Sequence, residues 1–100
     1  MNPHGMYLAM LLANARRSEA AALLLAAEPA PARIELLMPD GQSRAFPAPP
    51  LETVRALIEL LESGERDFSA NVHSACIEQV EITRAPGRLN ARIDAWAIEK

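Results

Sequence analysis

Several residue types are scarce in this sequence, and each scarcity excludes a class of protein. Cys76 is the only cysteine, so no internal disulfide can form and a disulfide-stabilised scaffold is excluded. A reducing compartment, the cytoplasm, is the expected location. Lys100 is the only lysine, and no Gly-x-x-x-x-Gly-Lys-Ser/Thr segment is present, which excludes a phosphate-binding P-loop. Aromatic residues make up only 4% of the chain, so aliphatic side chains must build the core.

Positive charge is also scarce relative to negative charge. Ten basic residues against 13 acidic ones give a net charge of −3, and the arginines are scattered. Proteins that bind nucleic acid usually carry a basic stripe, because neutralising phosphates drives their affinity. We therefore expect no nucleic-acid partner. Half of the residues are hydrophobic, which argues against disorder, and a length of 100 residues is typical of one domain.

No long apolar run is present. Residues 6–12 form a short apolar stretch, and Ala13-Asn14-Ala15 is similar to a signal-peptidase site, but no lysine or arginine precedes them. The stretch is too short to cross a bilayer, so we expect no membrane insertion. The spacing predicts an amphipathic helix over 6–17, with a frayed start at Asn2-Pro3-His4-Gly5. Its apolar residues at helical spacing are Leu8, Leu11, Leu12 and Ala15.

Residues 20–28 leave two structures open. The segment is apolar on all sides, so periodicity does not separate a helix from a strand. Its alanines favour a helix that continues from residue 6 to 27. A short run that is apolar on both faces equally fits a central strand after a break at Ser18-Glu19. We predict the strand, which a resemblance of the overall motif order to a known domain implies.

Alternation of apolar and polar residues predicts two hairpins. In the first, Ile34, Leu36 and Met38 precede a turn at Asp40-Gly41, and residues 43–46 return as a second strand. The second hairpin joins strands around 80–83 and 89–95 through 85–88.

The register of the second hairpin follows from its apolar residues. Pairing Arg84 with Leu89 sets Ile82 opposite Ala91 and Val80 opposite Ile93, so one face is apolar throughout. Pairing Arg84 with Arg88 mixes the two faces, because a slip of one residue reverses every side chain. We predict the first register, which also sets Glu81 opposite Arg92.

A proline-led helix lies between the hairpins. The segment Pro47-Ala48-Pro49-Pro50 ends the preceding strand and begins a helix over 51–63, for which Gly64 is a natural C-terminal cap. Its charged residues face outward. The apolar stripe consists of Leu51, Val54, Leu57, Ile58 and Leu61. A short strand is expected in 65–75, where Phe68, Ala70 and Val72 alternate with polar residues.

These elements predict one α+β domain over residues 1–100. An antiparallel sheet of about five to six short strands would carry the two helices, 6–17 and 51–63, on one face.

The order of motifs resembles the non-catalytic N-terminal domain of type II secretion and type IV pilus ATPases. The residues that carry the resemblance are Tyr7–Arg17, Glu28-Pro29, Ile34–Met38, Asp40-Gly41, Ala48-Pro49-Pro50 and Leu51–Ser63. It covers residues 6–63, with a looser likeness across 76–96, and implies a PAS-like sheet with a strand over Leu23–Ala27. That family usually carries Ser-Asp-Ile-His before its Glu-Pro. This chain has Leu24-Leu25-Ala26-Ala27 there, so interactions of those polar residues are not carried over.

Few residues are candidates for chemistry. His73 and Cys76 lie three apart, but a metal site needs three or four ligands, and His4 is the only other histidine. Ser74-Ala75 offers no oxyanion device for a Cys–His nucleophile. We predict no catalytic residue, no metal and no cofactor, with His73 at the surface and Cys76 buried at the start of a strand.

Three residues are candidates for interaction: Trp96, Asp40 and Gly41. Alternation places Trp96 on the polar face of the second hairpin, where it packs on a helix or anchors a partner. Asp40-Gly41 is most simply a turn.

The expected function is a non-enzymatic interaction or regulatory domain that docks to itself, as a homodimer, or to a partner protein. One alternative is a PAS-like sensor that binds a small molecule in a cavity left by its alanines. Another is a fragment of a larger secretion or pilus ATPase.

Overall fold

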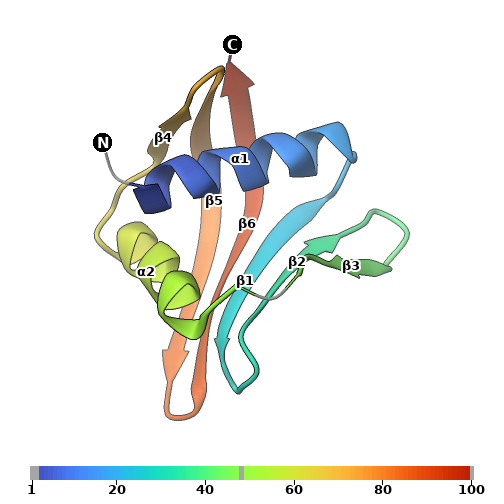
Figure 1. Cartoon of the computed structure of the whole chain (residues 1–100). Helices are drawn as coiled ribbons and strands as arrows, with labels where there is room; N and C mark the ends of the chain where they lie inside the picture. Colours follow the sequence, from blue (N-terminus) through green and yellow to red (C-terminus); the bar gives the residue numbers. More distant parts are fainter. Residues whose placement is uncertain (1–2, 48, 100) are drawn as a thin grey trace.

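The structure is a computed structural model that describes residues 3–47 and 49–99. Its elements are α1 (Pro3–Arg17), β1 (Ala22–Glu28), β2 (Arg33–Leu37), β3 (Ser43–Ala45), α2 (Leu51–Glu62), β4 (Asp67–Ala70), β5 (His73–Ala85) and β6 (Arg88–Glu99). The strands form one sheet in the order β3-β2-β1-β6-β5-β4, with every neighbouring pair antiparallel. Both helices lie on the same face of this sheet (Figure 1). The predicted α+β fold class is confirmed.

The segment that propensity left open, 20–28, contains the central strand β1. Leu23 and Leu25 face the helices and are fully buried, while on the other face Ala22 and Ala26 are buried and Leu24 is half-buried. This burial on both faces explains why the segment lacks alternation. The predicted break before it is confirmed, because α1 ends at Arg17 and Glu19 has a φ of 60°.

Helix α1 begins earlier than its apolar spacing predicts. The frayed start expected at Pro3, His4 and Gly5 is wrong, because these residues form the first turn of the helix; Asn2 lies outside the described residues. The fixed φ of proline suits a first helical turn. Gly5 is buried, so this first turn packs on the domain. The inward side of α1 includes Leu8 and Leu12, both fully buried.

Helix α2 matches its prediction closely. Pro50 precedes its first turn, and Gly64, at a φ of +98°, follows its C-cap residue Ser63. Ala48, in the predicted strand end, lies outside the described residues. Leu51 is the exception, because it is 36% exposed at the first position of the helix, where no further turn covers it. The buried stripe is Val54, Leu57, Ile58 and Leu61.

Strands β5 and β6 pair in the predicted register, with Arg84 opposite Leu89 and Val80 opposite Ile93. The ladder extends much further than predicted, to Ser74 opposite Glu99, so β5 begins at His73.

Register shifts between Ile77 and Val80 interrupt this ladder. Irregularities of this kind change which face a side chain occupies. Trp96 therefore pairs with Ile77 on the helix-covered face and is 4% exposed. Its predicted place on the polar face is wrong, and the alternative, packing against a helix, is correct.

The early start of β5 corrects two further predictions. Cys76 was expected to be buried at a strand start, but it lies within β5 and is exposed. Val72 was expected to share a face with Phe68, but β4 ends at Ala70 and Val72 lies in the following turn, 68% exposed. The uncovered face of the sheet carries ion pairs, including Arg92 Nε to Asp94 Oδ1 at 3.1 Å.

Candidate functional site

The side of α1 that faces away from the sheet is apolar. Met10 is 56% exposed there, and Met6 and Tyr7 are half-buried. Charged side chains usually occupy the outward side of a surface helix. Helix α1 contains no acidic residue. Its basic residues are His4 in the first turn and Arg16 and Arg17 in the last turn.

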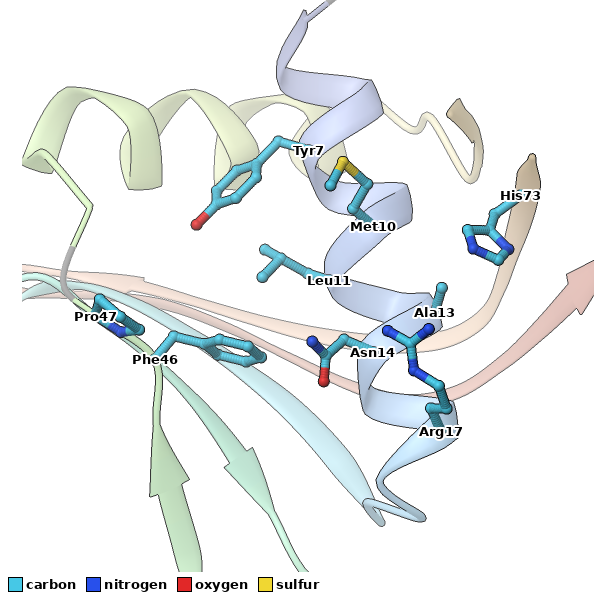
Figure 2. Close-up of a pocket in the computed structure, with 9 residues that line it drawn as sticks. All are labelled: Tyr7, Met10, Leu11, Ala13, Asn14, Arg17, Phe46, Pro47 and His73. Carbon is cyan, nitrogen blue, oxygen red and sulfur yellow. The ribbon is translucent and has the colours of Figure 1, made fainter. Parts of the chain in front are cut away.

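An open pocket of about 340 Å³ lies along this side of α1 (Figure 2). Its lining comes from α1, from the segment after β3 and from the start of β5. The lining residues are Tyr7, Met10, Leu11, Ala13, Asn14, Arg17, Phe46, Pro47 and His73. Its volume is near the lower limit of small-molecule sites, which span roughly 300–1,000 Å³.

The segment after β3 forms one wall of the pocket. The N–H of Phe46 donates to the carbonyl oxygen of Ile34 at 2.9 Å, which continues the β2–β3 ladder by one residue. Pro47 has no N–H and ends the ladder. The ring of Phe46 consequently projects beside α1, toward Asn14 and Leu11 (Figure 2).

The polar groups of the pocket include no carboxylate. Asn14 Oδ1 accepts a hydrogen bond from Ser18 Oγ at 3.4 Å. The ring of His73 extends from β5 toward α1 (Figure 2), and its Nδ1 atom is buried without a hydrogen-bond partner among the described residues. Arg17 supplies the one full charge of the lining. The pocket therefore combines apolar walls with a single cation.

A second, smaller pocket of about 210 Å³ continues the apolar surface across α1 to the β4–β5 turn. It shares Met10 and His73 with the first pocket and adds Met6 and the exposed Val72. The two pockets together are called the α1 surface below. Its residues are Met6, Tyr7, Met10, Leu11, Ala13, Asn14, Arg17, Phe46, Pro47, Ala70, Asn71, Val72 and His73.

Trp96, the first predicted interaction residue, connects the sheet to α1. Its Nε1–H donates to the carbonyl oxygen of Leu12 at 3.1 Å. The Arg16 guanidinium lies 5.0 Å from the centre of its ring and donates to its backbone carbonyl. Being 4% exposed, Trp96 leaves almost no surface for a partner.

Asp40 and Gly41, the other predicted interaction residues, lie in the exposed β2–β3 turn. Gly41 has a φ of +90°, a conformation that favours glycine, and Asp40 Oδ1 accepts a hydrogen bond from the N–H of Gln42 at 3.0 Å. The structure thus explains both residues by the turn and does not bring them together with Trp96.

His73 and Cys76 cannot act as a pair, because residues three apart in a strand face opposite sides of the sheet. A hydrogen bond to Asp67 raises the pKa of the Cys76 thiol, and desolvation and the nearby carboxylates raise it further. The thiol is therefore protonated, and less nucleophilic, at neutral pH. Among the described residues, no group of three or more metal-type ligands is found.

The α1 surface is the feature that sequence analysis missed. One signal for it was present: Met6 and Met10 lie one turn apart, on the opposite side of the predicted helix from Leu8 and Leu12. The other walls, Phe46 and Val72, carried no signal, because no local pattern relates them to α1.

Compared with known protein families, curated proteins and solved structures, the chain has no match. The resemblance to the accessory domain of secretion and pilus ATPases therefore stays a prediction. None of the helices in the described part of the chain is long and apolar enough to cross a membrane.

Proposed function

We propose that this chain is a non-enzymatic protein-interaction domain that docks a partner protein through the α1 surface. The observation that carries the proposal is the exposure of Met10, at 56%, beside Val72, at 68%, on one continuous apolar surface. Grouped apolar side chains at a surface mark interaction sites. The resemblance of the motif order to the accessory domain of secretion and pilus ATPases supports an accessory or regulatory role in such a machine.

The composition of the α1 surface suits docking. Tyr, Phe and Met are enriched at protein interfaces, and here Tyr7, Phe46 and Met10 supply all three. Methionine adapts its shape to a partner because its side chain is unbranched and flexible. The open form of the pocket leaves these side chains accessible to another protein.

Site-specific photo-crosslinking tests the proposal. A photoreactive amino acid would replace Met10 in the cell that makes the protein, and Glu59, exposed on α2, would carry it in the control. We expect a discrete protein adduct from position 10 only. The crosslinked protein would then be purified, and Met10→Asp should weaken its binding at least about tenfold, or about 1.4 kcal/mol. Equal adducts at both positions, or unchanged affinity of Met10→Asp, would contradict docking on α1.

A second candidate function is the small-molecule sensor. It is supported by the pocket of about 340 Å³ and by the buried, unpartnered Nδ1 of His73. A thermal-shift screen with a metabolite panel tests it, because a ligand of the folded state raises the melting temperature. A sensor predicts stabilisation by one compound class that Phe46→Ala and His73→Ala both abolish. Stabilisation that survives both substitutions would place the ligand elsewhere.

A further inference from the structure

We infer that the α1 surface receives an acidic amphipathic helix of a partner protein. The inference rests on the docking function proposed above and names the chemistry of the docked segment. The length and the charge of the surface support it, as does the fact that neither described helix of a second copy could supply such a segment.

The length of the surface suits a helix. From Tyr7 to Arg17 the lining follows α1 over eleven residues, a rise of about 15 Å at 1.5 Å per residue. A partner helix of about three turns matches this length. Helices that dock in grooves present apolar residues at i, i+3, i+4 and i+7. The hollow between α1 and Phe46-Pro47 offers apolar walls to such a stripe.

The charge of the surface selects an acidic partner. The chain as a whole has a net charge of −3, yet no carboxylate lines either pocket, and Arg17 adds a positive charge. Four other arginines are already paired with carboxylates, namely Arg33, Arg55, Arg84 and Arg92. Arg17 is exposed and forms no ion pair within the described residues. A carboxylate on a docked helix would complement it, and charge complementarity of this kind sets specificity.

A second copy of the chain does not supply this helix. The segment Pro3–Arg17 contains no aspartate or glutamate, so two α1 helices that packed together would leave Arg17 without an opposite charge. Helix α2 carries acidic residues, but its apolar stripe from Val54 to Leu61 is buried against the sheet. Neither described helix therefore combines exposed apolar and acidic sides.

Peptide binding to the full chain, measured by fluorescence anisotropy, tests the inference. The probe is a fluorescein-labelled 14-residue peptide with leucine at positions 4, 7, 8 and 11, glutamate at 1, 5, 9 and 12, and alanine elsewhere. The matched probe has lysine in place of every glutamate. We expect the glutamate peptide to bind at least about tenfold more tightly at low salt, with the preference reduced as salt rises.

Charge reversal identifies the residue responsible. Arg17→Glu should invert the preference in favour of the lysine peptide. The control Arg88→Glu makes the same change of charge in the exposed β5–β6 turn and should leave the preference unchanged. Thermal melts would confirm that both variants fold. A preference that Arg17→Glu does not alter overturns the inference.

The remaining outcomes separate this inference from the docking function. If both peptides bind equally and Met10→Asp abolishes both, the acidic partner is refuted while docking on the α1 surface stands. If neither peptide binds, the helical partner is refuted, and crosslinking at position 10 decides the docking function separately. If the chain sediments as a dimer that Met10→Asp converts to a monomer, a second copy occupies the surface and the inference falls.

Discussion

Helices α1 and α2 cover the same face of one sheet, yet their outward sides differ in chemistry. On α2, the outward residues are charged and tied to the rest of the domain: Arg55 Nη2 lies 2.7 Å from Glu28 Oε2, and Glu62 Oε1 lies 2.6 Å from Arg84 Nη2. On α1, the outward side presents the exposed Met10, and Arg17 in the last turn forms no ion pair with the described residues.

This difference is the reason for assigning the proposed docking role to α1 and not to α2. Both inward sides cover the core, which accounts for the buried leucines of each helix. The outward side of α2 is explained by solvation and by ion pairs within the domain. The exposed apolar side of α1 has no such explanation within the fold, because exposed methionine adds nothing to the core. The proposed docking of a partner would account for it.

The largest expected effect concerns the inward sides, where the two helices should behave alike. Leu12 and Leu57 are both fully buried. Truncation of each to alanine should lower the free energy of unfolding by about 2–5 kcal/mol, from lost burial and the cavity that remains. Urea denaturation measures the loss. A cost below about 1 kcal/mol for Leu12→Ala alone would show that α1 is only loosely attached.

Trp96→Phe should have the next largest effect, because it removes contacts that Trp96 makes with α1 and not with α2. The substitution deletes the Nε1–H that donates to the carbonyl oxygen of Leu12. It also replaces the indole ring that Arg16 contacts with a smaller phenyl ring. We expect a loss of about 1–3 kcal/mol in the free energy of unfolding. The substitution should accelerate amide hydrogen exchange more in α1 than in α2. Equal acceleration in both helices would argue against a local tie.

A matched pair of outward substitutions should change stability little. Met10→Ser and Glu59→Ser lie at exposed positions of α1 and α2, and each should alter the free energy of unfolding by no more than about 0.5 kcal/mol. Affinity for the partner should distinguish the two variants, because only Met10→Ser should lower it. Strong destabilisation by Met10→Ser would instead make Met10 a structural residue and remove the contrast between the helices.

The smallest effect is a pH dependence of the α2 ion pair. The bidentate hydrogen bonds from Arg84, at 2.7 and 2.6 Å, hold the pKa of Glu62 below its ordinary value of 4.5, against a smaller opposing effect of desolvation. A depressed pKa contributes stability above the unfolded value that is lost as the pH falls through the folded value. Glu62→Gln should thus be slightly less stable than the natural chain at pH 7, and the gap should close below pH 4.5. A constant gap from pH 7 to pH 3 would show that the charge of Glu62 contributes nothing.

Local patterns predicted much of the fold because they act over a few residues. The stripe of α2 from Val54 to Leu61 follows from helical periodicity, and the pairing of Ile82 with Ala91 follows from keeping one face apolar. The patterns failed where the ladder is irregular. The register shifts near Gln79 move Trp96 to the covered face, and no residue preference announces such a shift.

Local sequence patterns were enough to predict α2, the register of the second hairpin and the absence of a P-loop, since each depends on residues close together in the chain, but they left the structure of 20–28 open. The α1 surface, in contrast, depends on how distant segments pack together. Phe46 lies beyond β3 at one edge of the sheet, and Val72 and His73 follow β4 at the other edge, yet all three border the pockets along α1. Their proximity results from strand order and from the path of α1 across the sheet, both of which depend on contacts between segments far apart in the chain.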